Sequence, residues 1–554
     1  MASVLEQRPW EAVHRELGVS PAEYDDRPLG AYVEIHAAER GERNALRYMG
    51  KVITYSQLNE QANRLANALV GLGVGRRDVI GFHTPNIPQY IIAMVAVSKI
   101  GCAGSGVSPL LTASELAYQV QDAGISVLLS FDQLAPRVLE GGVEMPASLK
   151  TLIFAGAGDY LGAPAPAVPE HASIACHSYR ALLAAASPEY SQQPVSGDDT
   201  FLIQYTGGTT GRPKGAELSV TTLLNNIAPA SVYRPFELAG ERVATAFPYF
   251  HIAGSAVSIV ALREAAEALV LPDPRDVEHI CREMAALRPT RLVAVPTLYQ
   301  MLIANPLSQE IDFSELRTAM SGAAPLTAET RKDLEALIGE GVLSDVFGMT
   351  ETGPVYISNP PQRAKADAVG LPVPGALVAI VDVETGNDEM PQGEPGEIIT
   401  AGPHVMKGYL NLPEESARAV REWRGQRWMY TGDVGYMDEE GYVHLSDRAK
   451  DMLIVGGFKV FSVEVEDKLA SLDFIAQSAL IGTPDEARPG NDIVNLYVEL
   501  EQEARARDTT ELEAEILAYC RDNLAAYKVP KRIHFIDQIP LTPVGKLDKK
   551  ALRS

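Results

Sequence analysis

The sequence predicts an α/β protein, with a large N-terminal α/β domain of several sheets followed by a small C-terminal α+β domain. Two observations predict this division. Short apolar runs alternate with helical patterns through most of the 554 residues, and the order of elements changes after about Asp447. We therefore expect domains at residues 1–446 and 447–554, and the second is of ordinary size for an independent unit.

The large domain is expected to combine amphipathic helices with buried strands. Leucine and alanine recur at steps of four and three over residues 55–74, the spacing of a buried helical stripe, and a second helix is expected over 87–101. Prolines every two or three residues make 163–170 a surface loop. Apolar runs predict strands, several of them in a parallel sheet, at residues 78–83, 125–131, 151–156, 201–205, 242–247, 268–272 and 291–296.

The small domain has its own order of elements. A short strand comes first, and a basic, turn-rich segment that begins at Pro540 comes last. Between them the pattern predicts a helix from Val463, strands near 478–481 and 493–498, a charged helix near 510–524 and a strand at 532–536.

Composition excludes several classes of protein. With 72 acidic and 48 basic residues, the formal net charge is −24 and the sequence pI is about 4.9, which argues against nucleic acid or an anionic membrane as the main partner. The four cysteines lie far apart, so neither a disulfide framework nor a zinc site is expected. The N-terminus lacks a signal pattern, and the apolar run at 90–97 is too short for an integral membrane span. We expect a cytoplasmic protein.

The segment QYTGGTTGRPKGAELS, Gln204–Ser219, is typical of a phosphate-binding loop. Its glycines let backbone N–H groups approach an anion, and its threonines and Lys214 add donors. It is not a Walker loop, because Pro213 precedes the lysine and Gly215 follows it in place of serine or threonine. The loop follows an expected strand, and open α/β sheets bind ligands at the carboxyl ends of their strands.

Five further motifs follow the glycine loop in a fixed order. They are SGAAPL (321–326), DVFGMTET (345–352), MYTGD (429–433), DRAKDMLIVGGFKVFSVEVE (447–466) and PLTPVGKLDKK (540–550). Together they resemble the adenylate-forming enzymes, which include acyl-CoA synthetases, nonribosomal adenylation domains and beetle luciferases. The resemblance covers roughly residues 30–550. It implies that a carboxylate attacks the α-phosphorus of ATP and that pyrophosphate leaves.

The resemblance also implies a nucleotide site. The glycine loop would hold the pyrophosphate half of ATP, Phe347 would stack on adenine, and Asp433 with Arg448 would bind the ribose. Lys546 would act at the α-phosphate and the substrate carboxylate, where a fixed cation contributes on the order of 10²–10³ in rate. The residues implied in nucleotide binding are Thr206, Gly207, Gly208, Thr209, Thr210, Gly211, Lys214, Gly322, Ala323, Ala324, Asp345, Phe347, Gly348, Met349, Thr350, Asp433, Arg448 and Lys546.

Catalysis and acid binding are assigned by the same resemblance. Glu351 is implied as the Mg²⁺ ligand, since a hard carboxylate oxygen suits a hard ion that bridges phosphates. Small residues near His251 predict room for an apolar acid larger than acetate, and a fatty, aromatic or alicyclic acid is left open. The implied catalytic residues are Lys546, Glu351, Thr206, Lys214 and His251, and the implied acyl pocket contains His251, Ala253, Gly254, Gly322 and Met349.

Coenzyme A is the expected acceptor of the acyl group. The motif GGFKVFSVEVE resembles CoA ligases most, and FPYFHIAG holds no carboxylate for a substrate amino group. We expect no fused carrier domain, because the chain ends eight residues after Lys546. The resemblance implies that the small domain is mobile, with Lys450 at its hinge and Gly456, Gly457 and Phe458 at the CoA tunnel. Lys528, Lys531 and Arg532 either meet the CoA phosphates or serve solubility.

Four positions depart from the common pattern of the family. Gly207 replaces a frequent serine, Phe347 a frequent tyrosine, Tyr430 a frequent arginine and Ser462 a frequent proline. None of these changes removes a charged catalytic group, so we expect altered affinity and not inactivity.

Two other functions stay open at this point. An acyl-AMP ligase would make the same intermediate and load a separate carrier protein. A non-catalytic nucleotide-binding module would be expected to lack the catalytic charges, yet Lys214, Glu351 and Lys546 are all present. Homodimer formation is also left open.

Overall fold

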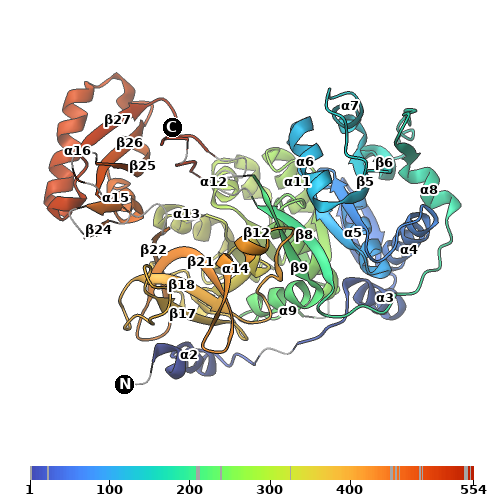
Figure 1. Cartoon of the computed structure of the whole chain (residues 1–554), viewed down its shortest axis with the longest axis horizontal. Helices are drawn as coiled ribbons and strands as arrows, with labels where there is room; N and C mark the ends of the chain where they lie inside the picture. Colours follow the sequence, from blue (N-terminus) through green and yellow to red (C-terminus); the bar gives the residue numbers. More distant parts are fainter. Residues whose placement is uncertain are drawn as a thin grey trace. The chain divides into compact units, whose positions relative to one another are not determined.

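The chain forms two compact units in a computed structural model (Figure 1). The large unit contains Trp10–Leu377 and Thr400–Met429, and the small unit contains Met1–Pro9, Val378–Ile399 and Tyr430–Ser554. The predicted α/β class with several sheets is confirmed. The structure describes residues 3–21, 24–206, 212–237, 240–324, 326–448, 453–455, 458–460, 462–485, 488, 491–541, 547–549 and 551–553.

The predicted boundary between residues 446 and 447 stays a prediction. In the structure, 378–399 and 430–446 group with the C-terminal segment. β17, β18, β21 and β22 belong to one five-stranded sheet, of order β17-β18-β21-β20 with β22 paired to β21, and their pairing joins 378–399 to 430–446. Its strands are β17 (Leu377–Val381), β18 (Gly396–Ala401), β20 (Val420–Trp423), β21 (Gln426–Met437) and β22 (Val443–Arg448).

An eight-stranded sheet of the large unit has the order β19-β9-β8-β4-β3-β5-β6-β7. Pairs from β8 through β7 are parallel, whereas β9 pairs antiparallel with both β8 and β19. The four strands predicted between residues 78 and 205 are confirmed to within one residue at each end. The strands are β3 (Val79–His83), β4 (Ala103–Gly106), β5 (Ile125–Phe131), β6 (Thr151–Ala155), β7 (Ala175–Ser178), β8 (Thr200–Thr206), β9 (Lys214–Ser219) and β19 (Gly408–Tyr409).

A nine-stranded sheet of the same unit has the order β16-β15-β14-β13-β12-β10-β11-β1-β2. Its middle is parallel from β14 to β1, and its two ends are antiparallel hairpins. The three strands predicted between 242 and 296 are confirmed here. The strands are β1 (Asn44–Tyr48), β2 (Lys51–Thr54), β10 (Arg242–Thr245), β11 (Glu267–Val270), β12 (Arg291–Ala294), β13 (Thr318–Ser321), β14 (Leu343–Gly348), β15 (Val355–Ser358) and β16 (Leu371–Pro372).

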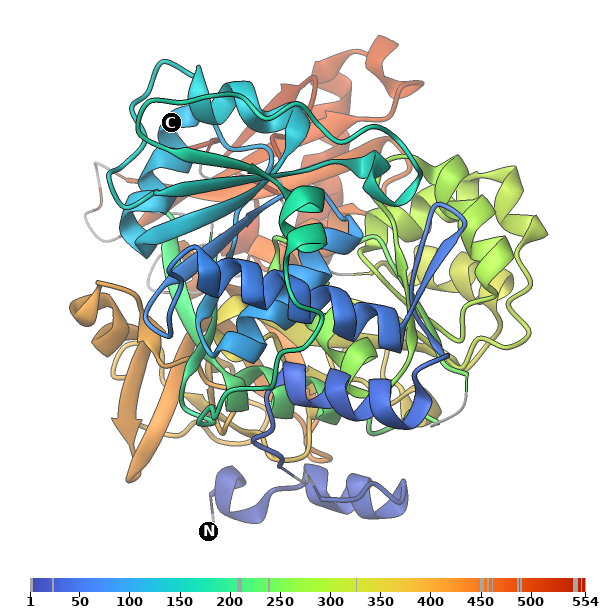
Figure 2. The same ribbon diagram turned by 90° about the vertical axis from the view of Figure 1, so that its right-hand side faces the viewer.

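Both predicted helices of the large unit are confirmed as α4 (Tyr55–Gly71) and α5 (Pro88–Ile100). Thr54 begins α4 with a capping box, in which its hydroxyl accepts from the Gln57 backbone N–H and its own N–H donates to the Gln57 side chain. Every residue of α5 is buried, and apart from Gln89, Ser98 and Lys99 the helix is mainly apolar, as expected of a core helix. Figure 2 shows α4 lying beside α3 (Leu29–Arg40). Residues 163–170 contain neither helix nor strand, as predicted.

Shorter helices complete the large unit. Within the described part of the chain, no helix combines the length and apolar character needed to cross a bilayer. The remaining helices of this unit are α2 (Trp10–Glu16), α6 (Ala113–Ala123), α7 (Ala135–Leu139), α8 (Tyr179–Ala185), α9 (Val220–Ala230), α10 (Ile252–Arg263), α11 (Val277–Leu287), α12 (Pro296–Ala304), α13 (Ala328–Ile338) and α14 (Pro413–Ala419).

The C-terminal part of the small unit is a three-stranded sheet, β25-β26-β27, packed with two helices around a common apolar core. The helices and strands predicted there are confirmed. Beyond α1 (Val4–Gln7), the elements are β23 (Leu453–Val455), β24 (Phe458–Val460), α15 (Ser462–Leu469), β25 (Ile475–Pro484), β26 (Asp492–Leu500), α16 (Thr509–Asn523) and β27 (Arg532–Ile536).

Candidate active site

The glycine loop connects two antiparallel strands. β8 ends at Thr206, β9 begins at Lys214, and these two residues pair with each other. The Tyr118 hydroxyl on α6 donates to the Pro213 carbonyl at 3.0 Å, and the Arg212 guanidinium lies 5.3 Å from the Tyr118 ring centre. The end of the loop is therefore attached to α6 and leads into a strand and not into a helix. The other predicted loop residues, Gly207, Gly208, Thr209, Thr210 and Gly211, lie outside the described residues.

Lys214 is engaged by two side chains that the sequence did not single out. Its ammonium Nζ lies 2.6 Å from Glu415 Oε2 and 5.1 Å from the centre of the Tyr409 ring. Glu415 also accepts a hydrogen bond from Arg418 Nη1 at 2.9 Å. The hydrogen bond and charge of Lys214 lower the pKa of the Glu415 carboxyl. Glu415 stands 201 residues from Lys214 along the chain, which is why no local pattern revealed the pair.

Glu351 is connected to Lys214 through Tyr409. The Tyr409 hydroxyl donates to Glu351 Oε1 at 2.7 Å, and the Met406 N–H donates to the Glu351 carbonyl at 2.9 Å. Glu351 is buried, with 6% of its surface exposed. Burial, followed by the neighbouring Glu351 charge, raises the pKa of Tyr409, so its hydroxyl keeps its proton and stays a donor. We call Lys214, Glu415, Tyr409 and Glu351 the Lys214 cluster.

The adenine motif and the SGAAPL motif follow neighbouring parallel strands. Ser321 at the end of β13 pairs with Asp345 in β14, so both motifs leave the same edge of the nine-stranded sheet. A Cβ atom on Gly322 would lie 2.9 Å from a methyl of Val346, and Ala323 has a φ of 69°. Ala324 follows and is exposed. The tight approach between the two segments explains why a glycine stands at 322.

At the end of β14, the backbone of Gly348 passes close to Pro354, just before β15 begins. A Cβ on Gly348 would lie 1.8 Å from the Pro354 carbonyl oxygen, so only glycine fits there. The Phe347 ring lies edge-on to Tyr356 with centres 5.6 Å apart. Met349 packs against the main apolar core, and Thr350 begins the 3₁₀ turn that contains Glu351. Their predicted nucleotide contacts stay predictions.

Asp345 has a partner within the large unit. Arg331 of α13 forms an ion pair with its carboxylate. Burial raises the pKa of Asp345, and the nearby Arg331 charge opposes that rise. The carboxylate is thus held in position, and its contact with nucleotide remains a prediction.

The implied acyl-pocket residues His251, Ala253 and Gly254 lie at the start of α10. His251 is the N-cap, and its Nδ1 accepts from the Ala253 N–H at 3.2 Å. A Cβ on Gly254 would lie 2.3 Å from the Pro248 carbonyl oxygen, so this glycine is required by backbone packing. Gln204 of β8 lies 3.4 Å from Ser255 Oγ, which brings the start of α10 next to the strand that leads into the glycine loop. The acyl-pocket assignment stays a prediction.

The ribose motif belongs to the small unit. Asp433 is 6% exposed and pairs with Arg448 across β21 and β22, so the backbone places the two predicted ribose ligands opposite each other. Tyr430, one of the departures from the family pattern, donates its hydroxyl to the Gly386 carbonyl at 2.8 Å. Tyr430 is buried, with 6% of its surface exposed.

Described residues before and after Lys546 make contacts within the small unit. Lys546 itself, Lys450, Gly456 and Gly457 lie outside the described residues, and of Phe458 only its place at the start of β24 is described. Leu541 and Leu547 form an isolated bridge, and Lys549 Nζ lies 2.8 Å from Glu466 Oε1. Lys549 also donates to Ser462 Oγ. Ser462, where a proline is frequent in the family, thus helps to attach the C-terminal motif to α15.

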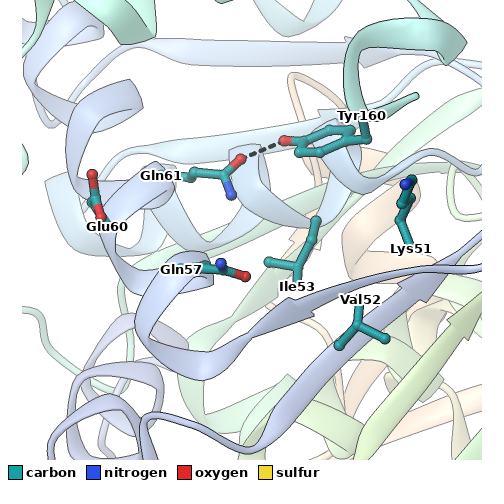
Figure 3. Close-up of a pocket in the computed structure, with 7 residues that line it drawn as sticks. All are labelled: Lys51, Val52, Ile53, Gln57, Glu60, Gln61 and Tyr160. Carbon is teal, nitrogen blue, oxygen red and sulfur yellow. Dashed lines mark hydrogen bonds between the residues drawn. The ribbon is translucent and has the colours of Figure 1, made fainter. Parts of the chain in front are cut away.

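A pocket of about 310 Å³ lies elsewhere in the large unit (Figure 3). Lys51, Ile53, Gln57 and Gln61 are among its lining residues, and the Tyr160 hydroxyl donates to Gln61 at 2.5 Å. No residue that the sequence assigned to a site lines this pocket, so we do not assign it to the acid.

The six motifs and their placement define an adenylate-forming enzyme, and comparison with known proteins agrees. The chain belongs to the AMP-binding enzyme family, whose model matches residues 33–410, and the AMP-binding enzyme C-terminal domain matches residues 464–546. The family predicted from the motifs is therefore confirmed.

Three relatives illustrate the match. The chain is 32% identical to a long-chain-fatty-acid–CoA ligase of Yersinia pestis, over 96% of each chain. It is also 32% identical to a feruloyl-CoA synthase of an Amycolatopsis species, over 95% of this chain and 98% of that protein. The ATP-bound crystal structure of MatB from Rhodopseudomonas palustris superposes with a TM-score of 0.80 at 29% identity, over 95% of this chain and 98% of that one.

Proposed function

We propose that this chain is an ATP-dependent acid–thiol ligase that converts a hydrophobic carboxylic acid into its acyl-CoA by way of acyl-AMP. The class of enzyme, an AMP-forming acyl-CoA synthetase, is confirmed by the relatives. The nature of the acid, and the roles of individual residues, are the proposal. The observation that carries the residue roles is the Lys214 cluster, which holds a cation and a buried carboxylate against one tyrosine at the end of the glycine loop.

Adenylation needs charge neutralisation at the phosphates and alignment of the attacking carboxylate. In our proposal, Thr206 and Lys214 bind the leaving pyrophosphate together with the glycine-loop residues 207–211. Asp433 and Arg448 bind the ribose hydroxyls, and Lys546 stabilises charge at the α-phosphate. His251 and the start of α10 border the acid. Tyr409 is a positioning residue, because it fixes the Glu351 carboxylate through a 2.7 Å hydrogen bond.

The residues fit a magnesium ion that arrives with ATP. Among the described residues, no group of three His, Cys, Asp or Glu side chains could hold a metal ion. Mg²⁺ is commonly bound by one or two carboxylates plus substrate phosphates, and the buried carboxylate of Glu351 supplies one hard oxygen donor. When bound, the ion would neutralise phosphate charge. The role of Glu351 is then to orient the ion and its phosphates.

Coenzyme A is the proposed acceptor, with Lys450 as hinge and Gly456, Gly457 and Phe458 at its tunnel. Relatives that share 32% identity are named for a long-chain fatty acid and for ferulate, which supports a fatty or an aromatic acid, and an alicyclic acid stays open. Cytoplasmic location belongs to the same proposal, and homodimer formation stays open. The second candidate, loading of a carrier protein, would use the same adenylate with another thiol.

The test is a panel of fatty, aromatic and alicyclic acids with ATP, Mg²⁺ and CoA, in which pyrophosphate and thioester are both measured. We expect pyrophosphate release to require an acid and Mg²⁺, and AMP release over many turnovers to require CoA as well. In the same assay, Lys546→Ala should release pyrophosphate about 10²-fold more slowly, because it removes the cation at the α-phosphate. Formation of ADP and phosphate would contradict the mechanism. Thioester on a holo-carrier protein but not on free CoA would favour the second candidate.

A further inference from the structure

The lysine proposed to bind pyrophosphate has an anionic partner within the chain itself. Lys214 Nζ lies 2.6 Å from Glu415 Oε2, close enough for a charge-assisted hydrogen bond. A carboxylate beside a phosphate-binding lysine competes with the ligand for the same cation. We propose that Glu415 is a resident counter-ion, which gives up Lys214 when the phosphates of ATP bind and takes it back when pyrophosphate leaves. This inference rests on the proposed function.

Both partners are placed so that the exchange needs only a side-chain movement. Lys214 is fixed through its backbone, because it begins β9 and pairs with Thr206. Glu415 is fixed through α14, whose Ser416 Oγ accepts from the Tyr409 N–H at 2.8 Å, while Tyr409 pairs with Ala216 of β9. The strand that carries the lysine and the helix that carries the glutamate are thus held in a constant relation.

The pair is accessible to water, and the glutamate has a second cation. The side chains of Lys214 and Glu415 are 25% and 34% exposed. Arg418 Nη1 donates to the other carboxylate oxygen, Glu415 Oε1, at 2.9 Å. When Lys214 turns to a phosphate, Glu415 therefore keeps both a cation and water, and no buried charge is left without a partner.

Lys214 can exchange Glu415 for phosphate and return, because the two anions bind the lysine with different strength. A partly exposed ion pair changes an equilibrium constant by only about two- to five-fold. A polyphosphate carries more negative charge than one carboxylate and offers several acceptor oxygens, so it outcompetes Glu415 for the lysine. Once the bond to the α-phosphorus breaks, pyrophosphate has lost its attachment to the nucleotide. The return of Lys214 to Glu415 then favours the release of pyrophosphate.

The test is binding of inorganic pyrophosphate to the full chain, by calorimetry and by competition against ATP in the adenylation assay. Glu415→Gln should bind pyrophosphate about two- to five-fold more tightly, because the competing anion is gone. A purely structural role for Glu415 would give the opposite sign, since losing a support weakens the site. Arg418→Ala should bind pyrophosphate about two-fold more weakly, because Glu415, having lost Arg418, then binds Lys214 more tightly and competes more strongly with the ligand.

Glu414→Gln is the matched control, since it removes the same charge from the neighbouring residue of the same helix. Glu414 is 86% exposed and lies 3.8 Å from Arg418. This variant should bind pyrophosphate as the wild type does. In a Lys214→Met background, Glu415→Gln should have no effect, because there is no lysine to exchange.

Three results would overturn the inference: unchanged or weaker pyrophosphate binding in Glu415→Gln, equal tightening in Glu414→Gln, or a full Glu415→Gln effect in the Lys214→Met background. Failure of the proposed function looks different. In that case the wild type forms no acyl-CoA from any acid, or Lys214→Met alone binds pyrophosphate as tightly as wild type.

Discussion

Two ion-pair clusters of the large unit use the same kinds of side chain in different surroundings. In the first, Glu241 lies between Arg291, whose Nε is 3.2 Å away, and Arg317, whose Nη1 is 2.8 Å away. The side chains of Glu241 and Arg291 are 2% and 3% exposed. In the Lys214 cluster, Lys214 and Glu415 are 25% and 34% exposed. The difference in water access decides what each cluster can do.

Glu241 is buried from solvent, so water cannot solvate its carboxylate if an ion-pair partner is lost. Burial opposes its ionisation, but a hydrogen bond from Thr290 and the charge of Arg291 keep the pKa of its carboxyl below the usual value. Burial also lowers the pKa of Arg291. Removing the Glu241 charge would leave Arg291 buried without its ion-pair partner, so this cluster holds the segment before β10 against β12 and cannot exchange partners. In our proposal Lys214 can exchange Glu415 for a phosphate, because Arg418 and water still stabilise the Glu415 carboxylate after ATP has displaced it.

The largest expected effect comes from breaking the buried cluster. Glu241→Gln should lower the free energy of unfolding by about 3–5 kcal/mol, because Arg291 is left as an uncompensated buried charge. Glu415→Gln makes the same chemical change at a partly exposed pair and should have little effect on stability, because water solvates the charge that is left. Urea unfolding of both variants and the wild type measures the comparison. Similar losses in the two variants would show that exposure does not separate the clusters.

A smaller loss of stability is expected from a side chain added at Gly348, where the backbone near the Lys214 cluster is tightly packed. Gly348→Ala would place a Cβ 1.8 Å from the Pro354 carbonyl oxygen, so the backbone must move. We expect a loss of about 3 kcal/mol, at the upper end for overpacking, together with weaker ATP binding because Glu351 follows three residues later. Gly71→Ala is the control, since a Cβ there meets no atom within 4 Å. Thermal unfolding and ATP titration of both variants are the measurements, and equal behaviour would contradict the packing argument.

The smallest effect concerns a buried group that stays neutral. Burial lowers the pKa of His404 to about 3, its Nε2 lies 2.8 Å from Thr400 Oγ1, and its ring stacks on Tyr356. Below the unfolded pKa of about 6.5 the unfolded chain binds a proton that the folded chain does not, so stability is lost as pH falls toward about 3.

Between pH 6.5 and pH 5 this histidine alone should account for a loss of about 2 kcal/mol. The measurement is the free energy of unfolding at both pH values for the wild type and for His404→Gln. The variant should lose about 2 kcal/mol less over this interval. A pH dependence that is the same in both proteins would contradict the assignment.

The sequence by itself determined the family, the class of fold and the residue types of the site. Stretches such as 55–74 and 125–131 carry a strong hydrophobic period, so α4 and β5 follow from local physics. The resemblance of the motifs also predicted that Lys214 and Glu351 act in one nucleotide site, and their roles there stay predictions.

Tertiary structure alone decided how the strands are shared between sheets and which side chains meet. β8 and β10 look alike in sequence, yet they belong to different sheets, because strand pairing depends on contacts between distant segments. Tyr409 and Glu415 carry no local signal. They reach Lys214 only because β19 adds to the edge of β9 and α14 follows it. An ion pair between residues 201 positions apart is a property of the folded chain, since only folding brings the two charges within 3 Å.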